Sequence, residues 1–247
     1  MRFHAPAAER TDDVVELPHD EARHLIRVLR LKVGATIRVF NGRGSEFDAV
    51  VAAVSKDGAR IRIGAGRDTV PEACVLVTLA QAVLKGDKMD DVVRDAVMMG
   101  VAAIQPLVAT RSEVALAALE RGHRWERWQR IAVSSAKQCG RAVVPAVLEP
   151  RTFKDLSVSL AEMTLSGPGL MFVEPSASTD ALSIGDLDEA SPRETTVLIG
   201  PEGGWAAEEI EGGATACRLV TLGARTLRAD AMALVVLTAL FTRWREL

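Results

Sequence analysis

The 247-residue chain lacks the segments that mark membrane, secreted and disulfide-bonded proteins. Its longest uncharged apolar run, residues 231–242, is about half of the roughly 20 residues that cross a bilayer. The amino terminus has no apolar core of the kind found in signal peptides. Three cysteines lie far apart and form no Cys-x-x-Cys pair. We therefore expect reduced thiols, no membrane partner and a location in the cytoplasm.

Several catalytic motifs are also missing. The sequence contains no Gly-x-Gly-x-x-Gly, Gly-x-x-x-x-Gly-Lys-Ser/Thr, Gly-x-Ser-x-Gly or His-Glu-x-x-His motif. These absences disfavour dinucleotide and nucleoside triphosphate binding, serine hydrolases and zinc proteases. The four histidines include no pair at metal-ligand spacing, so we expect no metal. The remaining expectation is a cofactor that is neither a pyrophosphate nor a metal.

Positive charge is concentrated in two clusters, although the whole chain carries a net charge of −3. The first cluster is unopposed by acids and consists of Arg23, Arg27, Arg30, Lys32, Arg38 and Arg43, with His24 among them. The second, opposed only by Glu126, consists of Arg121, Arg124, Arg127, Arg130, Lys137 and Arg141, with Trp125, Trp128 and Gln138 interspersed. Cations bind phosphates and planar groups stack on unpaired bases, so this composition favours RNA. A solvated face of extended arginines is the alternative.

The hydrophobic pattern predicts two domains. Short alternating runs between residues 35 and 63, with a turn at Asn41-Gly42, indicate a small β domain over residues 1–72. Residues 73–247 alternate apolar strands with helical patterns, which is typical of an α/β domain with a largely parallel sheet. Strands are expected at 75–84, 101–108, 170–173, 195–199 and 218–222, and helices at 87–99, 124–138, 153–163 and 231–241. The last helix is apolar on every side and should be buried in the domain or between subunits.

Two glycine-bearing strand exits are the candidate ligand site. The first runs from Ile199 to Gly204 and the second from Leu222 to Asp230. Ligands of open α/β sheets bind outside the carboxyl ends of strands, and glycine lets the backbone approach a planar ligand closely. A tight structural connection would use similar residues, so the spacing alone leaves both interpretations open.

These motifs resemble those of a known family. The 16S rRNA (uracil-N3)-methyltransferase family of the SPOUT superfamily is resembled by Leu198-Ile199-Gly200-Pro201-Glu202-Gly203-Gly204-Trp205, followed by Glu208-Glu209-Ile210 and then by Leu222-Gly223-x-Arg225-x-Leu227-Arg228. Three further matches lie in the expected order: His24-Leu25-x-Arg27-Val28-Leu29-Arg30, Lys85-Gly86-Asp87-Lys88-Met89 and Gln138-Cys139-Gly140-Arg141. The resemblance thus covers nearly the whole chain.

The resemblance implies a PUA-like or OB-like β domain, followed by a SPOUT domain that forms a trefoil knot, and a homodimer. It implies S-adenosylmethionine as cofactor and 16S rRNA or the small ribosomal subunit as partner. The cofactor-binding residues would be Phe172, Val173, Glu174, Ile199, Gly200, Pro201, Glu202, Gly203, Leu222, Gly223, Thr226, Leu227 and Arg228. The RNA-binding residues would be Arg23, His24, Arg27, Arg30, Lys85, Lys88, Gln138 and Arg141.

Methylation of a uracil nitrogen needs an in-line sulfonium methyl, removal of the imide proton, and stabilisation of charge on the ring oxygens. We assign the last role to Arg228, whose guanidinium keeps its charge; a phosphate clamp or a salt bridge to Asp230 is the alternative. Asp230 or Glu202 could assist proton removal, and so could solvent. The family usually reads Thr-Glu-Thr-Ala where this chain has Ala229-Asp230-Ala231-Met232. The lost hydroxyls could weaken cofactor binding, and Asp230 could instead be a helix cap.

Two other functions therefore stay open. An rRNA-binding assembly factor could keep the fold and lose methyl transfer through the altered 229–232 segment. A ribose 2′-O-methyltransferase would show an Asn-x-Gly-x-x-x-Arg motif at the entry to its α/β domain. The only asparagine of the chain, Asn41, lies in the β domain.

Overall fold

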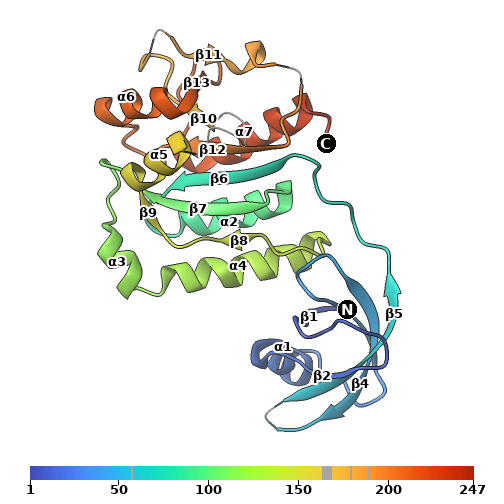
Figure 1. The fold of residues 1–247 in the computed structure, drawn as a ribbon. Helices are drawn as coiled ribbons and strands as arrows, with labels where there is room; N and C mark the ends of the chain where they lie inside the picture. Colours follow the sequence, from blue (N-terminus) through green and yellow to red (C-terminus); the bar gives the residue numbers. More distant parts are fainter. Residues whose placement is uncertain (57, 163–168, 179, 189) are drawn as a thin grey trace. The chain divides into compact units, whose positions relative to one another are not determined.

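The computed structural model describes residues 1–56, 58–162, 169–178, 180–188 and 190–247, and its elements are labelled in Figure 1. The chain forms two compact units. Unit 1 contains Met1–Glu72 and Val133–Val144, and unit 2 contains Ala73–Ala132 and Pro145–Leu247. The division predicted at residue 72 leaves the segment 133–144 out of the first unit.

Unit 1 is built on a five-stranded sheet with the order β1-β3-β4-β5-β2. The strands are β1 (Arg2–His4), β2 (Val14–Glu16), β3 (Thr36–Phe40), β4 (Glu46–Val54) and β5 (Ala59–Arg67). Alternation in β3 buries Ile37 and Val39 and exposes Arg38, as a half-buried strand requires. The Asn41 side chain accepts hydrogen bonds from the N–H groups of Arg43 (2.8 Å) and Ser45 (3.1 Å), which forms the predicted turn. The predicted β domain is confirmed, and β1 and β2 are additions to it.

Two short helical segments, α1 (His19–Arg23) and η1 (His24–Val28), pack on this sheet. Leu25 points into the core, and Arg23, His24 and Arg27 are exposed. The end of α4 (Arg124–Cys139) completes unit 1. The Arg2 guanidinium donates to the backbone oxygens of Ala136, Lys137 and Arg141 at 2.9, 3.2 and 2.7 Å. The helical spacing predicted α4, but it could not show that the first part of the helix belongs to unit 2 and its last part to unit 1.

Unit 2 contains an eight-stranded sheet with the order β11-β13-β10-β12-β6-β7-β8, and β9 pairs with β7. The strands are β6 (Leu76–Ala82), β7 (Ala103–Val108), β8 (Ala146–Val147), β9 (Arg151–Thr152), β10 (Gly169–Phe172), β11 (Leu182–Ser183), β12 (Glu194–Ile199) and β13 (Cys217–Thr221). All of their recorded pairings are parallel. The predicted α/β fold is therefore confirmed, and the trefoil knot stays a prediction.

The other helices of unit 2 are α2 (Lys88–Met99), α3 (Leu116–Arg121), α5 (Phe153–Glu162), η2 (Ile184–Asp186), α6 (Ala207–Ala216) and α7 (Ala229–Arg243). Met163, the predicted end of α5, lies outside the described residues. Helix α2 packs on α7, and α5 packs on α6 (Figure 1). Leu234 and Val235 of α7 are exposed, so burial within the domain accounts for only part of this apolar helix. Among the described residues, no helix is long and apolar enough to span a membrane.

Candidate functional site

The two predicted strand-exit loops border one cavity of about 540 Å³ in unit 2. Strands β10, β12 and β13 lead into it, and the amino-terminal ends of α2 and α7 close its other side. The predicted cofactor-binding residues all line this cavity except Gly203 and Gly223. Its further lining residues are Lys88, Pro175, Gly204, Trp205, Arg225, Ala229, Asp230 and Met232. The fold thus brings together two loops whose first residues, Ile199 and Leu222, are 23 positions apart in the sequence.

Gly200 follows β12 and is required by a close contact with the Trp205 indole. A Cβ at this position would lie 3.0 Å from Trp205 Nε1 and 3.1 Å from Cε2. The buried indole donates a hydrogen bond of 2.9 Å to the backbone oxygen of Phe172 and packs against Phe153. Trp205 therefore ties the end of β12 to the end of β10. This role of Trp205 was not predicted, because no local sequence pattern shows what an indole contacts.

Arg111 holds the Gly200–Gly204 loop, and Glu209 holds the start of α6 that follows it. No sequence pattern pointed to Arg111, and Glu209 was noted only as part of the family motif. Arg111 Nη1 donates a 2.9 Å hydrogen bond to the backbone oxygen of Gly203. The buried Glu209 carboxylate accepts from the N–H groups of Ala206 (3.0 Å) and Thr110 (2.8 Å). Glu209 stands three residues after Ala206, as the glutamate of a capping box does, but alanine has no side-chain oxygen, so only half of the box is formed. The link to Thr110 depends on tertiary structure and was not predictable.

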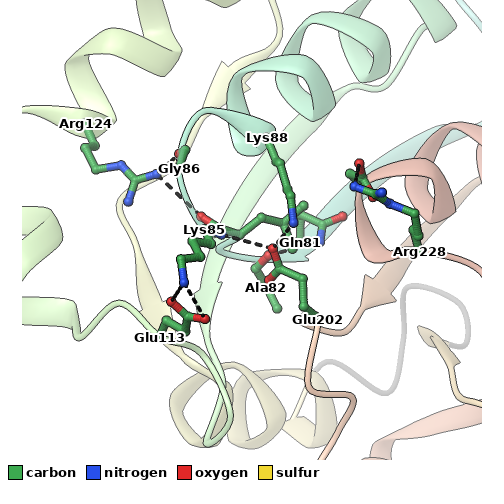
Figure 2. Close-up of polar contacts among 11 residues, drawn as sticks. Gln81, Ala82, Lys85, Gly86, Lys88, Glu113, Arg124, Glu202 and Arg228 are labelled. Atoms are coloured by element: carbon green, nitrogen blue, oxygen red, sulfur yellow. Dashed lines mark hydrogen bonds and ion pairs between the residues drawn. The ribbon is translucent and has the colours of Figure 1, made fainter.

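Two ion pairs line the cavity (Figure 2). Lys88 Nζ lies 2.8 Å from Glu202 Oε1, and both side chains are 35% exposed. Arg228 Nε and Nη2 each donate a 3.0 Å hydrogen bond to the Asp230 carboxylate. The structure thus contains the Arg228–Asp230 salt bridge that was considered as an alternative. Lys88, predicted to contact RNA, lies in the wall of the cavity.

The carboxylates of both ion pairs, Glu202 and Asp230, are held in their charged form. Burial raises the pKa of Glu202, but hydrogen bonds from Lys88 and from backbone N–H groups outweigh burial, and the pKa lies below its ordinary value. The hydrogen bonds from Arg228 lower the pKa of Asp230 despite a smaller opposing effect of burial. Their charges also keep Arg228 protonated, because its pKa is raised by the Asp230 carboxylate. As long as these pairs persist, each carboxylate is a weak proton acceptor.

The turn before α2 is held by two other cations. Lys85 Nζ lies 3.0 Å from a Glu113 carboxylate oxygen, and both side chains are exposed. Arg124 Nη2 donates a 2.7 Å hydrogen bond to the backbone oxygen of Gly86, whose φ of 64° favours glycine. Figure 2 shows Lys85 and Arg124 on either side of this turn.

The cations of the first basic cluster are exposed on unit 1, and one of them, Arg43, forms an ion pair of 2.9 Å with Glu9. Arg23 and Arg27 line a hollow of about 210 Å³ together with His19, Ile26 and Lys56. Within the described chain, no ion pair is recorded for Arg23, Arg27, Arg30 or Lys56. These cations can therefore meet phosphates without first losing a protein partner.

The second basic cluster differs from the expected stacking surface. Trp128 is fully buried and its Nε1 donates to Asp90 at 3.1 Å. Trp125 donates to the backbone oxygen of Val147 at 2.8 Å. The prediction that these indoles stack on bases is wrong for Trp128, which is buried in unit 2. Trp125 is half-buried, and its stacking on a base stays a prediction.

Arg141 also differs from its predicted role. Its buried guanidinium forms an ion pair with Glu72, and Lys137 Nζ lies 2.7 Å from Glu21. Both pairs lie within unit 1. Because the Arg141 guanidinium is buried and paired, it has no accessible charge for RNA. Gln138 is exposed. Among the described residues, no cluster of His, Cys, Asp or Glu side chains could hold a metal ion.

Comparisons with known proteins identify the family. A family model described as RNA methyltransferase domain matches residues 71–241, and one described as RNA methyltransferase PUA domain matches residues 17–64. Ribosomal RNA small subunit methyltransferase E of Synechocystis is 31% identical, and the match covers 87% of this chain and 68% of the relative.

Solved structures agree with this match. Ribosomal RNA small subunit methyltransferase E of Neisseria gonorrhoeae, bound to S-adenosyl methionine, shares 31% identity with a TM-score of 0.85, over 98% of this chain and 97% of that chain. A Legionella pneumophila structure with the bound cofactor SAM has a TM-score of 0.87 at 27% identity, over 98% and 96%. The resemblance noted from the sequence motifs is confirmed. The chain belongs to the family of RNA methyltransferases that includes ribosomal RNA small subunit methyltransferase E, with a PUA domain before its methyltransferase domain.

Proposed function

We propose that this protein transfers the methyl group of S-adenosylmethionine to N3 of a uridine in the 16S rRNA of the small ribosomal subunit. The observation that carries the proposal is the single cavity to which both glycine-bearing loops contribute, lined by two cation–carboxylate pairs. Its volume lies within the range of about 300–1,000 Å³ that is common for small-ligand sites.

The lining residues fit S-adenosylmethionine. Phe172, Ile199 and Leu222 provide apolar walls for a planar base, and Gly200 keeps one wall free of a side chain. The carboxylates of Glu174, Glu202 and Asp230 complement a sulfonium and an ammonium group, and the Arg225 guanidinium complements a carboxylate. When bound, the cofactor supplies a methyl group on a positively charged sulfur.

The position of Arg228 supports a reaction whose transition state is planar and negatively charged. Its guanidinium is largely exposed at the cavity and is oriented by Asp230, so its remaining N–H donors are available to a ligand. Uracil that has lost its N3 proton carries negative charge on its ring oxygens. Arg228 would stabilise this charge, as preorganised donors do at other anionic transition states.

The exposed cations of unit 1 support RNA as the substrate. The hollow lined by Arg23, Arg27 and Lys56 suits a backbone phosphate, and His24 and Arg30 extend the same exposed surface. Lys85 and Gln138 are exposed and stay in the proposed RNA interface, whereas Arg141 is dropped from it. The proposal includes the cytoplasm as location and a homodimer, in which a second copy would cover Leu234 and Val235 of α7.

The test is a calorimetric titration with S-adenosylmethionine, followed by incubation of protein and cofactor with unmodified 16S rRNA. The rRNA is then digested to nucleosides and analysed by mass spectrometry against a 3-methyluridine standard. Cofactor binding and one added 3-methyluridine are the expected result. Absence of binding at millimolar cofactor would favour the assembly factor, because the changed 229–231 segment would then have lost the cofactor. A methyl group on ribose would favour the 2′-O-methyltransferase.

A further inference from the structure

A buried amide oxygen without a hydrogen-bond partner lies on a strand that pairs with a cavity strand. Gln81 is fully buried in β6, and its Nε2 donates a 3.0 Å hydrogen bond to the backbone oxygen of Ala82. Its Oε1 is the one buried side-chain atom for which no partner is found among the described residues. An unsatisfied buried acceptor costs about 1–3 kcal/mol, so its retention calls for an explanation.

The position of Gln81 connects this oxygen to the catalytic cavity. Ala80 and Ala82 face the cluster that contains Phe153 and Trp205, so Gln81 faces the opposite side of the sheet. It is paired in register with Ile199, a cavity residue on β12. Figure 2 shows the Gln81 side chain directed toward the region that holds Lys88, Glu202 and Arg228. Lys88 lines the same cavity as Ile199, and its ammonium has several N–H donors and one hydrogen-bond acceptor, Glu202.

Lys88 occupies a position at which a positive charge destabilises the helix. It is the first residue of α2, where the positive end of the helix dipole repels a cation. Its ammonium is partly buried and depends on Glu202, which also accepts a 3.2 Å hydrogen bond from the Lys85 N–H. A cation in this unfavourable place, with an acceptor that a ligand can displace, can exist in two arrangements.

We propose, building on the function proposed above, that Lys88 and Glu202 are catalytic residues that separate when uracil binds, and that Gln81 is a positioning residue. Lys88 turns from Glu202 to one of the two uracil carbonyl oxygens that flank N3, while the Gln81 carbonyl accepts another of its N–H groups. Glu202 takes the N3 proton, and the electron pair of the N–H bond stays on N3. That pair then forms the bond to the methyl carbon, and the carbon–sulfur bond breaks with its electrons remaining on sulfur. Solvent finally removes the proton from Glu202, and the Lys88–Glu202 pair forms again.

The local electrostatics support this exchange. Burial is the largest influence on the pKa of Glu202 and raises it, whereas Lys88 opposes burial. When Lys88 turns away, burial persists and the Lys88 hydrogen bond is lost, so the pKa of Glu202 rises and the carboxylate becomes a better base. The other charged groups near this carboxylate are Arg228, whose pKa responds to Glu202, and Asp230, whose pKa responds to Lys88. Since Arg228 stays with Asp230, it does not replace Lys88 as the partner of Glu202.

The experiment compares the full-length protein with Lys88→Met, Glu202→Gln and Gln81→Met. Cofactor affinity, RNA affinity and the single-turnover methylation rate are measured with unmodified 16S rRNA transcript and labelled S-adenosylmethionine. For Lys88→Met, we expect a loss of about 100-fold or more in the single-turnover rate, as for other preorganised donors, with RNA and cofactor affinities within about threefold. Lys88→Arg should recover part of this loss because it keeps the charge. Lys154→Met is the matched control, because Lys154 is exposed on α5 and does not line the cavity.

Two further readouts distinguish catalysis from a structural role. Glu202→Gln should make the rate rise about tenfold per pH unit between about pH 6.5 and 8.5, since only uracil ionised in solution would react, whereas the wild-type slope should be shallower. Gln81→Met removes the unsatisfied oxygen together with the hydrogen bond to Ala82, so the melting temperature should change little, and yet the rate should fall about tenfold. Equal pH slopes would exclude Glu202 as the base, and a faster or unchanged Gln81→Met would exclude its role. A Lys88→Met variant that loses RNA affinity but keeps its rate would return Lys88 to the RNA interface. If the wild type transfers no methyl group, the proposed function itself fails.

Discussion

Replacing Gly200 with alanine tests whether the Trp205 indole holds the site together. The added Cβ would lie 3.0–3.3 Å from three atoms of the indole, which is rigid and cannot bend away as a flexible side chain does. Moving the ring strains the hydrogen bond from Nε1 to the Phe172 oxygen and the contact with Phe153. Overpacking costs about 1–3 kcal/mol. A lost buried hydrogen bond costs about as much again, so the free energy of unfolding should fall by about 3 kcal/mol.

Urea denaturation gives this difference, and calorimetry gives the accompanying change in S-adenosylmethionine affinity. Since Phe172 and Gly200 both line the cavity, we expect affinity to fall at least about tenfold, equivalent to about 1.4 kcal/mol. Gly212→Ala in α6 is the matched control, because its Cβ would meet no atom within 4 Å and alanine favours a helix by up to about 1 kcal/mol. A Gly200→Ala variant within about 0.5 kcal/mol of the wild type, with unchanged affinity, would show that the indole moves freely and refute the reasoning.

Three other perturbations test separate parts of the structure. Glu209→Ala should lower the free energy of unfolding by about 3 kcal/mol, since two backbone N–H groups lose their acceptor, and Glu209→Gln should cost less in the same urea titration. Burial raises the pKa of Cys217 to about 11, so iodoacetamide at about pH 8 should modify the exposed Cys74 first; equal rates by peptide mass spectrometry would contradict this. Arg23→Ala with Arg27→Ala should reduce the slope of log affinity for 16S rRNA against log salt by about 1.4–1.8, and an unchanged slope would remove the hollow from the RNA interface.

Features that depend on neighbouring residues were predictable from the sequence. The alternation in β3 and the helical spacing of Met89, Val92 and Val93 in α2 identify their buried faces, because pleat and helix pitch are local properties. The strand exits after Ile199 and near Leu222 were located in the same way. Their meeting at one cavity follows from the parallel sheet, in which strands end at a common edge.

Features that depend on distant partners were not predictable. Trp128 and Arg141 lie among cations in the sequence, and the same composition suits an RNA surface or a set of structural contacts. Their partners Asp90 and Glu72 are 38 and 69 residues away, so only the tertiary structure distinguishes the two. Lys88 illustrates the same limit, since its partner Glu202 is 114 residues away. Composition therefore indicated the chemistry of these side chains, and the fold determined which of them reach a ligand.

The changed segment at residues 229–231 retains the charge of the site. Asp230 lies in the first turn of α7, where the helix dipole favours a carboxylate, and its short side chain reaches back to Arg228. The lost hydroxyls affect hydrogen bonding, because neither Ala229 nor Ala231 offers a polar side chain to the cavity. The Arg228 side chain is 75% exposed, against 35% for Lys88, although Asp230 at 28% is less exposed than Glu202. Solvent therefore screens the Arg228–Asp230 pair more strongly, and separating it changes the pKa of its carboxylate less. Lys88–Glu202 is therefore the pair whose separation can move a proton. The segment that departs from the family pattern, residues 229–231, belongs to the other pair, Arg228–Asp230.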